Sequence, residues 1–302
     1  MYQYLIYNQK IESEFEINFA RKAVFTETPD VTIKIGKVPE EIKDQINQGA
    51  YDGLKEDSMW FYVTDKAIYY ITNGNQIVIE PQNDSLTEFE LCSYLTGSAL
   101  ALLLMQKGIV PIHGSMIAHN GKVAIITGQS GSGKSTTVFE LLSRGCSFLS
   151  DDVSAIEVKE DKLTSLPAFP LQKLCRDLVE RNNLDLNSLT YIDEFRDKFA
   201  RNINLSQYED MPQGLDYIIE LVPYQGKSVE IKEVEGLDKL NMLTTNLYRS
   251  LVYEKMGVTT NRFEKMLTII SKAKMYQVFR PQMENSFQEV PNIIWNNLLQ
   301  LC

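Results

Sequence analysis

Eight consecutive residues, Gly128-Gln-Ser-Gly-Ser-Gly-Lys-Ser135, fit the pattern G-x-x-x-x-G-K-[ST], and Thr136 follows them. In this pattern the glycines let successive backbone N–H groups turn inward, without side-chain clashes, around phosphate oxygens. The lysine reaches the β- and γ-phosphates of a nucleotide, and the serine after it ligates Mg²⁺. The residues expected to bind the nucleotide are Gly128, Gln129, Ser130, Gly131, Ser132, Gly133, Lys134, Ser135 and Thr136.

The residues on either side of this loop support that interpretation. Residues 122–127 are apolar and β-branched, as in a buried strand. Residues 136–144 have helical composition, and Gly145 after them is expected to end the helix. A flexible glycine- and serine-rich linker would not be enclosed by a core strand and a helix. We therefore expect a nucleoside triphosphate at the positive N-terminal end of a helix.

Both histidines of the chain precede the loop. Asn120-Gly121 is a strong hairpin signal, so the strand before it should run antiparallel to residues 122–127. That register brings His113 near the start of the loop, where a structural role and a site role are equally favoured. His119 abuts the turn, is expected to be exposed, and is assigned no role.

Two adjacent aspartates, Asp151 and Asp152, follow the short apolar run 146–149. An acidic residue at such a strand end often holds Mg²⁺ in nucleotide-binding enzymes. Two neighbouring carboxylates can divide the work, one holding the metal while the other orients or deprotonates an attacking hydroxyl. The alternative is a solvated Asp-Asp turn.

The rest of the chain predicts two domains. Residues 1–85 contain short aromatic and β-branched segments, which indicate a β-rich N-terminal domain for packing or for substrate or partner recognition. Residues 86–302 would form the α/β catalytic domain. It would open with a helix reaching about residue 105, capped by Asn83-Asp84-Ser85 with Glu88. The apolar run 91–105 is too short to span a membrane and is typical of a buried helix.

Two further predictions concern the C-terminal half. The charged stretch 191–213 indicates a solvated helix or mobile loop, or else a lid that brings a cation to the phosphate. The cations of that stretch are Arg196, Lys198 and Arg201. Helices are expected over 237–255 and 262–272, with a final strand at 276–279.

Composition limits the partners and the compartment. The net charge of −10 excludes broad attraction to nucleic acid or to an anionic membrane. The four cysteines are far apart and form no C-x-x-C pair, which is typical of reduced, buried thiols. The first residues have neither a basic segment nor a cleavage site of the secretory type. We expect a cytoplasmic protein.

Taken together, His113-Gly114, the loop, and Asp151-Asp152 after Arg-Gly-Cys-Ser-Phe-Leu-Ser resemble the HPr serine kinase/phosphorylase family. The resemblance implies a PEP-carboxykinase-like core: a mixed sheet with flanking helices. It also implies that Asp151 is the general base, tuned by a nearby His113. Asp152 and Ser135 would hold Mg²⁺, and Lys134 would neutralise the β- and γ-phosphates.

Weaker similarity extends to HPr-kinase-like proteins of lasso-peptide and other peptide-maturation systems. It is carried by Leu166-Pro-Ala-Phe-Pro170, Asn246-Leu-Tyr-Arg249 and Phe279-Arg-Pro281. Two features depart from the HPr enzymes: Thr136 replaces a glutamate, and a glycine-rich signature downstream of the aspartates is absent. The matched motifs supply no arginine for the transition state, which leaves Arg201 and Arg249 as candidates.

The leading prediction is an ATP- and Mg²⁺-dependent kinase that phosphorylates a serine hydroxyl on a peptide or small protein. Two alternatives remain open: a nucleotide-binding regulatory or scaffold protein, and a kinase of a small hydroxylated metabolite. HPr kinases assemble as hexamers, so the resemblance also leaves a homo-oligomer open.

Overall fold

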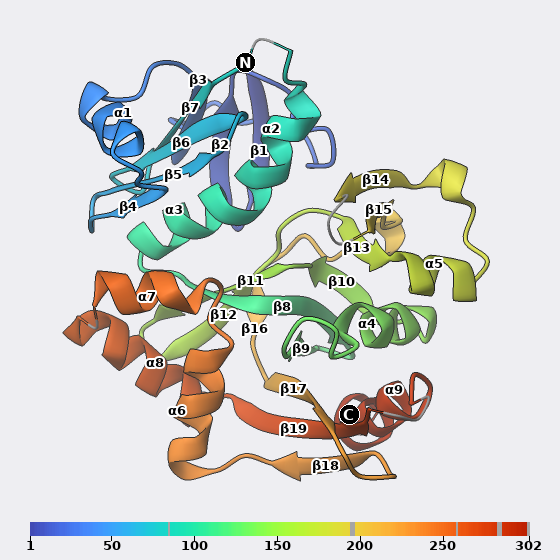
Figure 1. The fold of residues 1–302 in the computed structure, drawn as a ribbon. Helices are drawn as coiled ribbons and strands as arrows, with labels where there is room; N and C mark the ends of the chain where they lie inside the picture. The colour runs from blue at the N-terminus through green and yellow to red at the C-terminus, as the bar shows by residue number, and fades with distance from the viewer. Residues whose placement is uncertain (84, 194–196, 258, 283–285, 301–302) are drawn as a thin grey trace. The chain divides into compact units, whose positions relative to one another are not determined.

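The computed structural model describes residues 1–83, 85–193, 197–257, 259–282 and 286–300, and divides into two units (Figure 1). The first unit comprises Met1–Pro111 and Arg249–Thr259, and the second comprises Ile112–Tyr248 and Thr260–Cys302. The first unit therefore extends past residue 85, where we expected the boundary, and includes the apolar helix and a returning segment.

The first unit is built on a seven-stranded mixed sheet of order β1-β2-β3-β7-β6-β5-β4. The β-rich character expected for this region is confirmed. Its strands are β1 (Tyr2–Ile6), β2 (Gln9–Ser13), β3 (Val31–Ile35), β4 (Asp52–Leu54), β5 (Ser58–Val63), β6 (Ala67–Thr72) and β7 (Gln76–Pro81). Its helices are α1 (Glu40–Asn47), α2 (Glu88–Tyr94), α3 (Leu100–Gln106) and α7 (Ser250–Met256).

A continuous helical run, α2 to α3 through a π-helical segment at Leu95–Ala99, packs on β6. The run Glu88–Gln106 has the length and composition of a membrane span, but 72% of its apolar window is buried inside the protein. The prediction of a buried helix is confirmed. Its cap differs from the expected one: Thr87 and Glu90 form the capping box.

The second unit is built on a nine-stranded mixed sheet of order β16-β12-β11-β8-β9-β17-β19-β18, with β10 paired to β8. Strands β9, β17 and β19 are parallel, and β8 is antiparallel to β9. The mixed α/β class is confirmed. The strands are β8 (Val110–His119), β9 (Lys122–Thr127), β10 (Ser147–Ser150), β11 (Val153–Lys159), β12 (Lys162–Leu166), β16 (Gln213–Gly214), β17 (Tyr217–Tyr224), β18 (Glu230–Glu233) and β19 (Lys274–Pro281).

Helices cover this sheet, and a smaller sheet lies beside it (Figure 1). Helices α4 and α9 share one apolar cluster with β9, β17 and β19, whereas α8 contacts α6, β11 and β12. The smaller sheet has the order β13-β15-β14. These elements are α4 (Lys134–Ser143), α5 (Arg176–Arg181), α6 (Gly236–Thr245), α8 (Thr260–Lys272), α9 (Glu289–Ile294), β13 (Leu171–Cys175), β14 (Thr190–Asp193) and β15 (Lys198–Asn202).

Two secondary-structure predictions were wrong. The charged stretch 191–213 is neither a helix nor a loop throughout, because it supplies β14 and β15 of the small sheet. The expected helix 237–255 is broken into α6 and α7 at Arg249, whose φ of 53° is left-handed and cannot continue a right-handed helix. Arg196 lies outside the described residues.

The predicted hairpin before the loop is confirmed, and it requires a glycine. Gly114 pairs with Thr127, so His113 lies level with the residue that starts the loop. A Cβ on Gly114 would lie 2.6 Å from the carbonyl oxygen of Ile126, a backbone atom of the neighbouring strand. The close approach of β8 and β9 therefore depends on Gly114.

We expect Gly114→Ala to lower the free energy of unfolding by about 1–3 kcal/mol, because the added methyl group overpacks a fixed backbone. Gly214→Ala is the matched control, since a Cβ at Gly214 meets nothing within 4 Å. Chemical denaturation measures both. Equal stabilities for the two variants would contradict the close approach.

Candidate active site

The loop predicted to bind phosphate has the geometry that the sequence pattern requires. It begins where β9 ends at Thr127, and α4 begins at Lys134 with Gly133 as its left-handed N-cap. Gly128 has a φ of 132°, and a Cβ there would lie 2.6 Å from the carbonyl oxygen of Leu221. Strand, loop and helix therefore follow one another as expected.

Lys134 extends its ammonium across this loop. Its Nζ donates hydrogen bonds to the carbonyl oxygens of Gly128, at 2.7 Å, and Gln129, at 3.1 Å. Burial lowers the pKa of Lys134 to about 8; Asp151 acts in the opposite direction, and Lys198 adds to the fall. The ammonium is thus partly desolvated and held by neutral carbonyls, a setting in which an anion would stabilise its charge.

Unpaired buried atoms test whether these residues fit a nucleotide. Among the described residues, two buried side-chain polar atoms have no hydrogen-bond partner: Ser132 Oγ and Gln172 Oε1. Ser132 belongs to the loop itself, and the Gln172 amide donates to the carbonyl oxygen of Ser135 at 3.4 Å. A buried hydroxyl normally has a partner, and a phosphate oxygen would supply one for Ser132. The loop fits a phosphate ligand.

The aspartate pair is held in place by Lys173, a residue the sequence did not single out. Asp151 Oδ1 accepts from Ser115 Oγ at 2.5 Å, and Oδ2 accepts from the Lys173 backbone N–H at 2.7 Å. Asp152 Oδ2 accepts from Lys173 Nζ at 2.8 Å. Lys173 thus contacts both carboxylates, one with its main chain and the other with its ammonium. The aspartates do not form a solvated turn.

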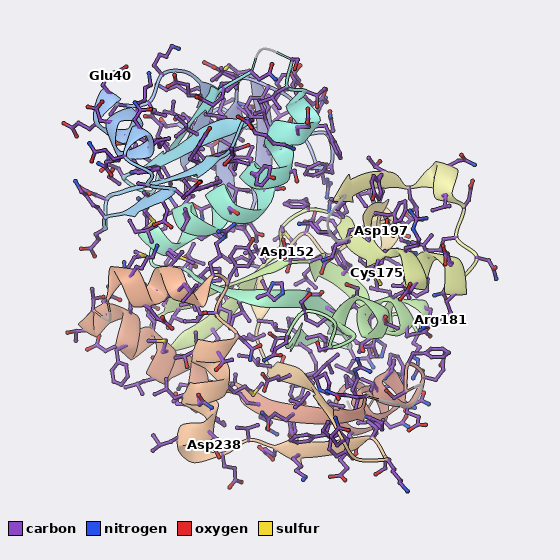
Figure 2. The ribbon with its side chains drawn as sticks, in the orientation of Figure 1. Glu40, Asp152, Cys175, Arg181, Asp197 and Asp238 are labelled. Atoms are coloured by element: carbon purple, nitrogen blue, oxygen red, sulfur yellow. The ribbon has the colours of Figure 1, made fainter. Side chains whose placement is uncertain are left out.

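His113 contacts Asp152, whereas the resemblance implied that it would tune Asp151. Its Nδ1 lies 3.5 Å from Asp152 Oδ1 and 3.2 Å from the Asp152 carbonyl oxygen. Burial opposes the charge of Asp152, but Lys173 and then His113 outweigh it and hold the pKa of this carboxyl well below its usual range. Figure 2 labels Asp152, with Cys175 and Asp197 on the adjoining small-sheet region.

A buried polar cluster joins β8 to β9, β17 and β19. Thr127 Oγ1 lies 2.6 Å from the His113 carbonyl oxygen and 2.9 Å from Asn246 Oδ1. The Asn246 amide donates to Glu220 Oε1 at 2.8 Å, and Gln277 donates to Glu220 Oε2 at 2.7 Å. Thr127, Glu220 and Gln277 are register partners on β9, β17 and β19, so strand pairing brings them together. The cluster fixes the backbone of His113.

The two candidate arginines are occupied elsewhere. The Arg201 guanidinium lies over the ring of Phe139, 4.8 Å from its centroid. Arg249 belongs to the first unit, where it donates to Ser98 Oγ at 2.5 Å. Neither observation supports a role at the phosphate.

Arg280 contacts the loop. Its Nε donates to the Ser132 carbonyl oxygen at 2.6 Å, and its Nη2 donates to the Gly131 carbonyl oxygen at 2.9 Å. Arg280 lies at the end of β19, which is parallel to β17, and β17 is in turn parallel to β9. The ends of parallel strands meet at one edge of a sheet, so the position of Arg280 in the sequence could have indicated its contact with the loop.

Ser135 and Asp152 supply oxygen atoms, the ligand type that Mg²⁺ prefers. The described residues contain no group of three or more His, Cys, Asp or Glu side chains that could hold a metal ion by themselves. Mg²⁺ in nucleotide sites usually takes one or two protein oxygens and completes its shell with phosphates and water. The residues present fit that arrangement.

Of the other sequence predictions, those for Cys92 and Cys146 are confirmed: both are buried free thiols, and burial raises the pKa of each to about 12. Cys175 is half-buried, and Cys302 lies outside the described residues. His119 packs on Trp295, with ring centroids 4.5 Å apart, so it is more covered than expected.

No family model matches this chain, and no curated protein does. Among solved structures, it is similar to the Hpr(Ser) kinase/phosphatase from Coxiella burnetii, at 14% identity over 63% of this chain and 97% of that one, with a TM-score of 0.32. A similarity this low says nothing about the function of this chain.

We expect the affinity for nucleotide to fall above about pH 8. Free Lys134 loses its proton there, whereas bound phosphates favour the charged form, so binding takes up a proton at alkaline pH. The Kd should rise by up to about tenfold per pH unit. Calorimetric titration of the wild type and of Lys134→Arg, whose guanidinium stays charged, measures this. A Kd that is constant between about pH 7.5 and 9.5 in the wild type would contradict it.

We expect Lys173 and Asp152 to be energetically coupled by about 1–3 kcal/mol, because neutralising either residue leaves the other as an unpaired, half-buried charge. A double-mutant cycle with Lys173→Met and Asp152→Asn measures the coupling; asparagine suits the left-handed backbone at this position. The exposed pair Lys272–Asp161 is the control, expected below about 1 kcal/mol. Additive effects at the site would refute the coupling.

Proposed function

We propose that this protein is an ATP- and Mg²⁺-dependent kinase that transfers the γ-phosphoryl group to a serine hydroxyl of a peptide or small protein. One observation carries the proposal. The Asp151 carboxylate is held by Ser115 and the Lys173 N–H, and it acts electrostatically on Lys134 of the phosphate loop. A carboxylate fixed beside a phosphate site is what a hydroxyl acceptor needs as a base.

The reaction would proceed as follows. The serine oxygen forms a bond to the γ-phosphorus while the bond from that phosphorus to the β,γ-bridging oxygen breaks. The hydroxyl proton goes to Asp151, and the products are ADP and the phosphoserine. Phosphoryl transfer needs mainly positioning and charge neutralisation, so Lys134 and the loop would contribute by holding the phosphates.

Asp151 is better suited than Asp152 to act as the base. Lys173 and His113 stabilise the charged form of Asp152 and depress its pKa, which makes it a weak proton acceptor. Asp152 and Ser135 are instead proposed as the residues that hold Mg²⁺, which would neutralise charge on the phosphates. His113 would act on Asp152, and through the shared backbone on the position of Asp151.

The acceptor is proposed from the sequence resemblance alone. Its weaker part points to peptide-maturation systems, of which lasso-peptide systems are one kind. An acidic protein of net charge −10 favours neutral or basic acceptor peptides over acidic ones. The proposed compartment is the cytoplasm, where ATP and Mg²⁺ are available.

We expect Asp151→Asn to reduce phosphoryl transfer by about 100-fold or more, because the amide cannot accept the hydroxyl proton. Nucleotide affinity should change far less than the transfer rate, because Asp151 is proposed to act on the nucleotide only indirectly, through its charge near Lys134. The assay is mass spectrometry of candidate serine peptides after incubation with labelled ATP and Mg²⁺. Asp238→Asn, exposed at the start of α6 (Figure 2), is the control and should keep full activity.

Transfer retained in Asp151→Asn would refute the base assignment. A label that appears on a hydroxylated metabolite instead of a peptide would identify the acceptor as a small molecule. Tight binding of MgATP without transfer to any acceptor would favour a nucleotide-dependent regulatory protein.

A further inference from the structure

The small sheet has two faces of different chemistry. Lys173 pairs with Ala200, and Cys175 pairs with Lys198, so the alternation of strand side chains puts both lysines on one face. Leu174 and Phe199 belong to the opposite face and pack with Phe139 of α4, and Arg201 of the same face lies over the Phe139 ring. One face therefore anchors the sheet to the helix of the phosphate loop, and the other presents two ammonium groups.

The cationic face is turned toward the candidate active site. Lys173 contacts Asp152 directly, as described above. Lys198 lies two positions away along the sheet from Lys173 and on the next strand, a diagonal of about 7–8 Å that a lysine side chain can span. Gln172, the residue before Lys173, donates to the carbonyl oxygen of Ser135 in the first turn of α4. Strand β13 and its partner β15 therefore lie beside the phosphate loop.

The charges of this region are arranged for an anion. Two ammonium groups, on Lys173 and Lys198, share one face of the small sheet, and a third, on Lys134, belongs to the phosphate loop. Of the two carboxylates, Asp152 is already paired with Lys173. Like charges in one half-buried site repel one another unless an anion lies among them. A triphosphate brings more negative charge than the loop lysine alone can neutralise.

We propose that Lys198 binds the γ-phosphoryl group of the nucleotide, so that the cationic face of the small sheet completes a site whose other side is the phosphate loop. Lys198 would then be the cation that neither Arg201 nor Arg249 supplies. This inference rests on the proposed function, because it assumes a nucleoside triphosphate in the loop. It adds a residue that distinguishes a triphosphate from a diphosphate.

The test compares the binding of MgATP and MgADP, measured by calorimetry without any acceptor. In Lys198→Gln the Kd for MgATP should rise by about tenfold or more, as for the loss of a charge-assisted hydrogen bond, while the Kd for MgADP stays within about twofold. Lys198→Arg keeps a positive charge and should retain the preference for MgATP. The control is Lys162→Gln, which removes an exposed lysine from β12 of the same unit and should change neither Kd.

Each outcome decides the inference. An unchanged ratio of the two Kd values in Lys198→Gln would overturn it and leave the proposed kinase standing. An equal loss of affinity for MgATP and MgADP would assign Lys198 a structural role and overturn the inference too. If the wild type binds neither nucleotide, the proposed function fails first. Circular dichroism of each variant verifies that the fold is retained.

Discussion

Lys173 holds two carboxylates at once, and the candidate active site depends on that arrangement. Its backbone N–H binds Asp151 and its ammonium binds Asp152. A single residue of β13 therefore fixes the directions of both acidic side chains and ties the small sheet to the strand end where they lie. If Asp151 and Asp152 faced water instead, their negative charges would repel each other and their side chains would adopt many rotamers. The contact converts a flexible acidic turn into a site with two distinct carboxylates.

The difference between these carboxylates comes from their partners. Asp152 has cationic neighbours, Lys173 and His113, which favour its charged form. The hydrogen-bond donors of Asp151 are neutral, a hydroxyl and a backbone N–H, and they orient its carboxylate. Adjacent residues of the same type can thus take different roles because Asp152 has a left-handed backbone, with a φ of 69°, so the regular alternation of strand side chains is interrupted between the two aspartates.

The sequence predicted the parts of this site that depend on local pattern. The loop, its flanking strand and helix, and the hairpin that aligns His113 with the loop all follow from glycine spacing and alternation. The partner of His113 did not follow, because the left-handed turn at Asp152 decides which aspartate faces the imidazole. Lys173 and Arg280 were missed for a similar reason: their roles arise from strands that are distant in sequence and become neighbours only through sheet order. The charged stretch 191–213 was misjudged because β15 pairs with both β13 and β14, and this pairing overrides the polar composition of the stretch.

Burial acts on the pKa of both Lys134 and Lys173, but the net pKa falls for one lysine and rises for the other. Burial disfavours the charge of both Lys134 and Lys173. For Lys173 the adjacent Asp152 outweighs burial and raises the pKa, so this ammonium is already satisfied by the protein. For Lys134 carbonyl oxygens are the direct partners, burial prevails, and the pKa falls. Arg280 binds carbonyl oxygens of the same loop from β19. The loop's carbonyls are thus occupied by cations, while the first N–H groups of α4 have no partner within the helix. An anion at those N–H groups would compensate the helix end and Lys134 together, which is why the loop, more than the aspartate pair, determines the class of ligand.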